Sequence, residues 1–158
     1  MIFFDSSALV KAYVNEDGTG VVIGAINRLN GLLFISDFVA LEVLTTLRTA
    51  FRDADRGRWR EVITEFTADF EGTFHVVDVG PDVLGRATTL VMEHRRARAR
   101  SMDLLHLATA LELQATRPAM PVTMVTSDRD LAALCREVGL RTFDPSREPL
   151  AALPMRRR

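Results

Sequence analysis

The chain has 158 residues, of which 47% are hydrophobic and 26% are charged, a balance typical of one globular domain with its own core. The formal net charge of −1 excludes the strong overall basic charge of many nucleic-acid-binding proteins, so any polyanionic substrate must be attracted by local patches or by bound metal. The single cysteine, Cys135, excludes an internal disulfide, and no stretch approaches the roughly 18 apolar residues of a membrane-spanning helix. We therefore expect a cytoplasmic protein that carries no signal peptide and binds no membrane.

Short apolar runs and helical stripes alternate along the chain. The apolar runs predict strands over 2–5, 32–35, 74–77, 122–126 and 140–143. Apolar residues spaced by three and four predict helices over 6–14, 37–53, 81–96, 102–115 and 128–138, with further stripes from Val21 to Leu29 and from Trp59 to Phe70. Ser36 and Ser101 are the predicted N-caps of two of these helices.

This alternation favours the α/β class, with a parallel sheet covered by helices on both faces. Five strands are expected in that sheet. We predict a single α/β/α domain over residues 1–146 and a C-terminal tail over residues 147–158 that is partly disordered.

Four acidic residues fall where this arrangement brings distant segments together. Asp5 ends the first strand, and Asp128 follows the fourth strand by two residues. Asp103 lies in the first turn of the helix before the fourth strand, and that helix must begin at the same edge of the sheet. Glu42 lies about 9 Å along its helix from Ser36, but helical side chains lean back toward the N-terminus. The spacing therefore predicts that four carboxylates converge on the carboxyl edge of the sheet.

The apolar surroundings of two of these acids favour a metal site. Glu42 lies on or beside an apolar stripe, and Asp103 belongs to a helix with almost no polar face. Carboxylates at such positions are rarely buried unless they are paired or bind metal, and oxygen ligands favour Mg²⁺ or Mn²⁺ over zinc. Each acid also has a structural alternative: Asp5 and Asp128 as N-caps, Asp103 as a partner of the helix dipole, and Glu42 as a residue at the border of the core.

The motifs around the acids resemble those of a known family. Asp5 opens the segment Asp-Ser-Ser-Ala-Leu-Val-Lys-Ala-Tyr, Glu42 lies in Ala-Leu-Glu-Val, Asp103 in Ser-Met-Asp-Leu-Leu-His-Leu-Ala-Thr-Ala, and Asp128 in Val-Thr-Ser-Asp-Arg-Asp-Leu. Together they resemble the four acidic motifs of PIN-domain proteins, especially the VapC-like toxins of type II toxin–antitoxin modules. The likeness runs from residue 1 to about residue 144. The second motif is weak by itself, whereas the other three are specific in combination.

The resemblance implies a parallel sheet in the strand order 3-2-1-4-5, Mg²⁺- or Mn²⁺-dependent endoribonuclease activity, a homodimer and a cognate antitoxin protein. On this hypothesis Asp5, Glu42, Asp103 and Asp128 are catalytic. Asp5, Asp103 and Asp128 hold the metal directly or through water, and Glu42 completes or orients the site. Hydrolysis in line at phosphorus would leave 5′-phosphate and 3′-hydroxyl ends.

Five residues are candidates for contacting RNA: Ser6, Thr126, Ser127, Arg98 and Arg100. The hydroxyls would hold a water or a phosphate oxygen. The two arginines lie just before Asp103 and would line the path of the RNA backbone; a solvated helix end is their structural alternative. His106, three residues past Asp103, is expected to be a packed or capping histidine.

Other functions fit parts of the same pattern. A non-catalytic PIN module would bind RNA or protein without cutting RNA in Mg²⁺ or Mn²⁺, and a metal-dependent DNA nuclease would use the same acids. A haloacid-dehalogenase-type phosphatase would need an aspartate at position 7, where Ser7 stands. A receiver domain would need a lysine after a late strand, whereas the only lysine is Lys11.

Overall fold

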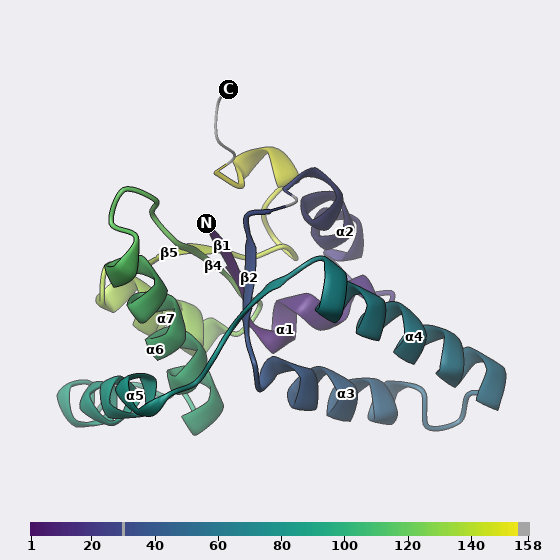
Figure 1. Cartoon of the computed structure of the whole chain (residues 1–158), viewed down its shortest axis with the longest axis horizontal. Helices are drawn as coiled ribbons and strands as arrows, with labels where there is room; N and C mark the ends of the chain where they lie inside the picture. The colour runs from purple at the N-terminus through teal and green to yellow at the C-terminus, as the bar shows by residue number, and fades with distance from the viewer. Residues whose placement is uncertain (30, 155–158) are drawn as a thin grey trace.

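The computed structural model describes residues 1–29 and 31–154, and these form an α/β/α sandwich (Figure 1). Its strands make one parallel sheet in the order β3-β2-β1-β4-β5, as predicted. The strands are β1 (Ile2–Phe4), β2 (Leu33–Ser36), β3 (His75–Val77), β4 (Thr123–Val125) and β5 (Arg141–Phe143). β1 is central: Phe3 pairs with Phe34 on one side and with Met124 on the other.

The described helices lie between the strands and cover both faces of the sheet (Figure 1). They are α1 (Ser6–Leu9), the 3-10 helix η1 (Val10–Ala12), α2 (Thr19–Arg28), α3 (Val39–Ala50), α4 (Arg56–Gly72), α5 (Pro81–Glu93), α6 (Ser101–Thr116), α7 (Arg129–Glu137) and the 3-10 helix η2 (Leu150–Ala152). In the part of the chain that the structure describes, no helix is both long and apolar enough to cross a membrane.

Two hydrophobic cores lie on opposite faces of the sheet. Phe4 belongs to the core under α1, α2, α3 and α4, whereas Phe3 belongs to the core under α5, α6 and α7. Both side chains are fully buried. Because β1 is buried on both faces, its sequence is a continuous apolar run and not an alternating one.

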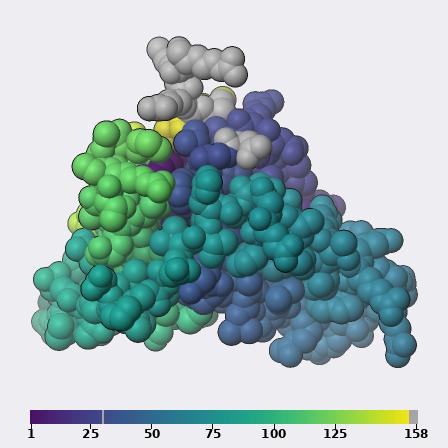
Figure 2. Space-filling model, viewed as in Figure 1, coloured from purple at the N-terminus to yellow at the C-terminus, as the bar shows by residue number. Residues whose placement is uncertain are grey.

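α3 and α4 together form an arm that projects away from the sheet (Figures 1 and 2). The aromatic stripe of α4 faces inward: Phe66 is buried and lies edge-on to Tyr13, with ring centroids 5.4 Å apart. Trp59 and Phe70 pack against the same core. The Tyr13 hydroxyl donates to Asp69 Oδ2 at 2.9 Å. The stripe therefore anchors the arm to the domain.

Two predicted helix caps are wrong. Ser36 is the last residue of β2, and α3 begins three residues later at Val39, after Phe38 in the N-cap position. Ser101 is the first residue of α6, whose N-cap is Arg100. In both places a serine before an apolar stripe was the signal, but the position at which the backbone enters the helix depends on the preceding turn.

The segment after residue 146 packs against the domain as far as it is described. η2 follows Pro149, and Leu153 is buried in the core under α2. The partial disorder expected of the C-terminal tail concerns in part residues 155–158, which lie outside the described residues.

Candidate active site

Asp5 and Asp128 lie at the carboxyl edge of the sheet, after the neighbouring strands β1 and β4. This is where the strand order reverses, because the chain builds β2 and β3 to one side of β1 and β4 and β5 to the other. In open α/β sheets the loops diverge at such a point and leave room for a ligand.

Asp5 is buried, and its two oxygens are held by hydroxyl and amide donors. Thr126 Oγ1 donates to Asp5 Oδ2 at 2.5 Å, Ser7 Oγ donates to the same oxygen at 3.1 Å, and the Ser7 amide donates to Oδ1. Burial raises the pKa of Asp5 above its ordinary value of 3.8, while the charge of His106 and the bonds from Thr126 and Ser7 act in the opposite direction. The Asp5 carboxylate is therefore held in place by these donors, in a buried site that disfavours its charged form.

Asp128 combines a cap with a place at the edge. Its Oδ1 accepts from the amides of Asp130 and Leu131, at 2.7 and 2.9 Å, and so caps α7. Its own amide donates to Thr126 Oγ1 at 3.0 Å. Thr126 thereby bonds to both Asp5 and Asp128. The structural reading of Asp128 as a cap is correct, and it uses only one of the two carboxylate oxygens among the described contacts.

Asp103 lies in the first turn of α6 and is coupled to the other two aspartates. Its Oδ2 accepts from the backbone amide of Arg100 at 2.6 Å. Burial raises its pKa, the Arg100 amide lowers it, and the negative charges of Asp128 and Asp5 raise it further. Because α6 precedes β4 in the parallel sheet, its first turn lies at the same edge of the sheet as Asp5 and Asp128.

Glu42 is held by a histidine. Glu42 Oε2 lies 2.5 Å from His106 Nε2, and His106 Nδ1 lies 3.0 Å from Ser36 Oγ. His106 is buried against the Phe38 ring, with centroids 4.5 Å apart. The sequence indicated a packed histidine, which is correct, but the bond to Glu42 was missed. The available signal was a polar residue three positions past Asp103, in an otherwise apolar helix.

The acids do not by themselves form a closed metal cage. Within residues 1–29 and 31–154, no three His, Cys, Asp or Glu side chains stand close enough together to hold a metal ion. The structure thus places the three aspartates at one edge of the sheet, and Glu42 bonds to His106.

Comparison with known proteins identifies the family of this fold. Residues 2–137 match the model of the PIN domain. The chain belongs to the PIN-domain family. A comparison with curated protein sequences gives no significant match.

Several solved structures share the PIN fold. VapC20 of Mycobacterium tuberculosis, a sarcin-ricin loop cleaving toxin, is 16% identical, with a TM-score of 0.64 and coverage of 89% of this chain and 96% of that one. FitAcB of Neisseria gonorrhoeae is 12% identical, with a TM-score of 0.68 and coverage of 94% and 100%. The DNA-bound VapBC of Salmonella typhimurium is 14% identical, with a TM-score of 0.66 and coverage of 91% and 97%. At these identities the likeness concerns the fold.

The residues predicted to contact substrate differ in whether they bond to the acids of the PIN domain. Thr126 is buried between Asp5 and Asp128, and the Ser127 hydroxyl donates to Asp144 Oδ1 at 3.0 Å. Ser7, and not Ser6, bonds to Asp5. Ser6 is half-buried at the start of α1. Arg98 and Arg100 are exposed in the segment that leads into α6, and among the described residues they form no ion pair.

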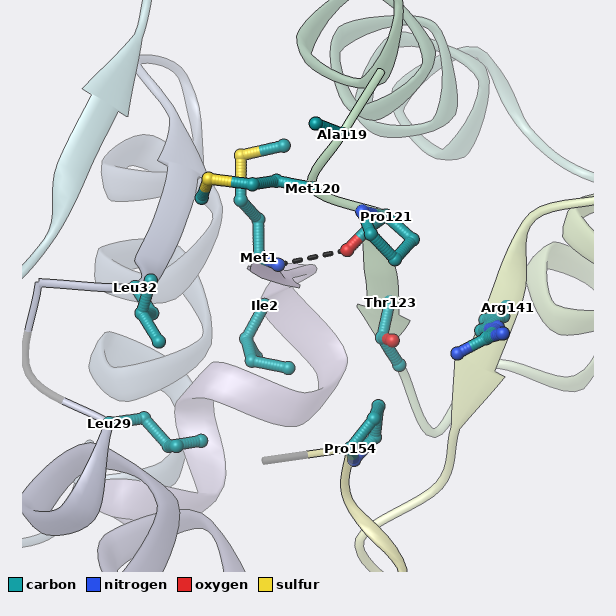
Figure 3. A pocket seen from close by; sticks show the side chains of 10 residues that line it. All are labelled: Met1, Ile2, Leu29, Leu32, Ala119, Met120, Pro121, Thr123, Arg141 and Pro154. Carbon is teal, nitrogen blue, oxygen red and sulfur yellow. Dashed lines mark hydrogen bonds between the residues drawn. The ribbon is translucent and has the colours of Figure 1, made fainter. Parts of the chain in front are cut away.

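Two pockets of the PIN domain lie at opposite edges of the sheet. One, of about 310 Å³, borders Asp128 and is lined in part by Arg129, Arg136 and Arg147. The other, of about 250 Å³, lies at the amino ends of the strands. Met1, Met120 and Arg141 are among the residues that line it, and the Met1 amino group donates to the Pro121 carbonyl oxygen at 2.9 Å (Figure 3). Of these two pockets, only the first borders one of the four acids, Asp128.

Proposed function

We propose that this PIN-domain protein is a Mg²⁺- or Mn²⁺-dependent endoribonuclease that hydrolyses RNA phosphodiester bonds and acts as the toxin of a toxin–antitoxin pair. The observation that carries the proposal is the placement of Asp5 and Asp128 at the switch point of the sheet, where Thr126 bonds to both, with Asp103 in the first turn of α6. Support comes from the fold shared with the toxin VapC20 and with VapBC.

The donor set fits a hard divalent cation. All three groups are carboxylates, and nucleases of the PIN family generally use divalent metal ions. Mg²⁺ is commonly held by one or two carboxylates and several waters, so three direct protein ligands are not required. Asp5, Asp103 and Asp128 would hold the ion directly or through water. The ion would supply charge that offsets the negative charge developing on the phosphate and would lower the pKa of a water.

The chain's own residues would position the reactants. Thr126 and Ser7 fix the Asp5 carboxylate, and the Arg100 amide fixes Asp103. Glu42 completes or orients the site from α3. Ser6, Thr126 and Ser127 are the proposed contacts to a water or a phosphate oxygen, and Arg98 and Arg100 are the proposed contacts to the RNA backbone.

A cognate antitoxin, a homodimer and a cytoplasmic location belong to the same proposal. The structure of VapBC from Salmonella typhimurium was solved with bound DNA. That DNA binding is a property of the VapBC assembly. Co-purification of this chain with the product of a neighbouring gene, and loss of RNA cleavage in that complex, is the outcome we expect.

Asp5→Asn tests the activity directly. We expect purified protein to cut RNA in Mg²⁺ or Mn²⁺, and the variant to lose at least about a hundredfold in rate, because it removes one charge of the metal site. The matched control is Asp53→Asn, which changes an exposed aspartate in the turn between α3 and α4. Mapping of cut ends on total RNA and on single-stranded DNA is the measurement.

Three outcomes would contradict the proposal. Undiminished cleavage by Asp5→Asn would remove the acids from the mechanism. Cleavage of DNA alone would indicate a DNA nuclease. Binding of RNA or of a protein partner without any cleavage would indicate a non-catalytic PIN module.

A further inference from the structure

His106 connects the two helical layers across the carboxyl edge of the sheet. It lies on α6, which packs on the face of Phe3, whereas Glu42 lies on α3, which packs on the face of Phe4. The bond between them at 2.5 Å therefore joins the two layers and does not lie within one of them.

The chemistry of the partners determines which atom donates the hydrogen bond between His106 and Glu42. The Glu42 carboxylate accepts hydrogen bonds, so His106 Nε2 must carry the hydrogen. On the other side of the ring, His106 Nδ1 lies 3.0 Å from the Ser36 hydroxyl oxygen, within hydrogen-bonding distance. Ser36 is fully buried at the end of β2. The imidazole ring is thus fixed at both nitrogens, and its N–H points at Glu42.

Glu42 depends on this one bond. Its side chain is 23% exposed, and among the described residues His106 is its sole hydrogen-bonding partner. Asp5 and Asp128, by contrast, are each held by two or more donors. A glutamate has three rotatable bonds, and without a partner it would sample positions away from the aspartates.

We propose that His106 is a positioning residue for the nuclease site. Ser36 orients its ring, and its Nε2–H holds the Glu42 carboxylate beside Asp5 and Asp103. This role rests on the proposed function, because Glu42 needs to be positioned only if it takes part in a nuclease site. The contact itself is independent of that function. Residues that orient catalytic groups in this way commonly contribute 10–100-fold to activity.

A pair of substitutions separates positioning from packing. His106→Phe keeps an aromatic ring against Phe38 but removes the donor, and His106→Gln keeps an N–H donor near the place of Nε2 but removes the ring. We expect His106→Phe to lower kcat for RNA by about 10–100-fold with KM little changed, and His106→Gln to retain most of the activity. In the Glu42→Ala background, His106→Phe should have almost no further effect, because the group that it positions is already absent.

The opposite pattern would overturn the proposal. Activity retained by His106→Phe and lost by His106→Gln would assign His106 to packing alone, as would additive losses in the double variant. Thermal melting of each variant shows whether a loss of activity is a loss of fold.

A second measurement does not depend on cleavage. The Nε2–H proton of His106 should give a slowly exchanging, strongly downfield NMR signal that shifts in Glu42→Ala and stays in place in Glu61→Ala, a change on the distant helix α4. If wild-type protein fails to cut RNA while this signal behaves as described, the proposed function fails and the contact stands. Absence of the shift overturns the positioning role even when RNA is cut.

Discussion

Thr126 shows how one side chain can organise two acids. Its hydroxyl donates to Asp5 and accepts from the Asp128 amide, and it lies 3.4 Å from the Ser7 hydroxyl. Thr126, the residue directly after β4, thereby holds the carboxylate of Asp5 and the backbone of Asp128. The helix caps predicted from sequence and the acidic site are consequently the same set of contacts, and the two interpretations of Asp5 and Asp128 do not compete.

Asp103→Asn should make the metal-free protein more stable at neutral pH. The pKa of Asp103 is raised in the folded state, so the folded protein binds this proton more tightly than the unfolded chain. The resulting stability is present below the unfolded pKa of 3.8 and is lost as the pH rises through the folded pKa. Asparagine keeps an acceptor for the Arg100 amide but carries no charge. At pH 7.5 in EDTA we expect a melting temperature higher by about 2–4 °C, the change that about 1 kcal/mol produces in a domain of this size.

The comparison requires two references for Asp103→Asn. The gain should vanish toward pH 3, where wild-type Asp103 is itself neutral. Asp53→Asn, on the exposed turn, should leave the melting temperature unchanged at both pH values. A lower melting temperature for Asp103→Asn at pH 7.5 would show that the three aspartates do not repel one another in the folded state.

At the scale of elements, α6 links the core to the site. One of its turns carries Asp103 and His106 toward the edge, while Leu107 is fully buried against the sheet. This helix has almost no polar face because it is covered by α5, α7 and the sheet. The two polar residues at its start are therefore conspicuous in the sequence, and they mark the site.

Leu107→Ala should be strongly destabilising. The substitution removes a side chain with 0% exposure and leaves a cavity, for which a loss of about 2–5 kcal/mol in the free energy of unfolding is typical. Leu41→Ala on α3 is the matched control, because Leu41 is 68% exposed and should change the free energy by less than about 0.5 kcal/mol. Urea denaturation measures both. Equal losses would mean that α6 is not anchored as described.

The whole molecule has a net charge of −1, so any electrostatic attraction of RNA must come from local groups of basic residues. Arg98 and Arg100 precede the helix that carries Asp103, and both are exposed. Their position at the acidic edge is the reason to test them as part of the RNA path.

Replacing Arg98 and Arg100 together by glutamate should weaken RNA binding. Each lost phosphate contact should also reduce the slope of log K against log salt by about 0.7 for a single strand. The control is the same charge reversal at Arg56 and Arg60, which are exposed on the α3–α4 arm. Fluorescence anisotropy over a salt series gives affinity and slope. An unchanged slope in the Arg98 and Arg100 variant, or an equal change in the control, would assign these arginines to the solvated end of the helix.

The sheet was predictable because its strands are short, continuous apolar runs between helical stripes. Because β1 is buried on both faces, the neighbouring residues Phe3 and Phe4 are both apolar. The carboxyl ends of parallel strands share one edge of the sheet, so the predicted strands also place Asp5 and Asp128 at the same edge. The start of α3 was misjudged because the turn at Asp37 and Phe38 postpones the helix. The bonds from Ser7 to Asp5 and from His106 to Glu42 depend on side-chain orientation in three dimensions, which spacing along the chain does not encode.

The central position of β1 has a consequence for how the protein is made. Thr126, the hydroxyl partner of Asp5, lies 121 residues further along the chain. Until β4 has left the ribosome, β1 has an unpaired edge, and Asp5 lacks both Thr126 and Asp128. During synthesis, the acidic edge can therefore assemble only after β4 and the residues that follow it have been made.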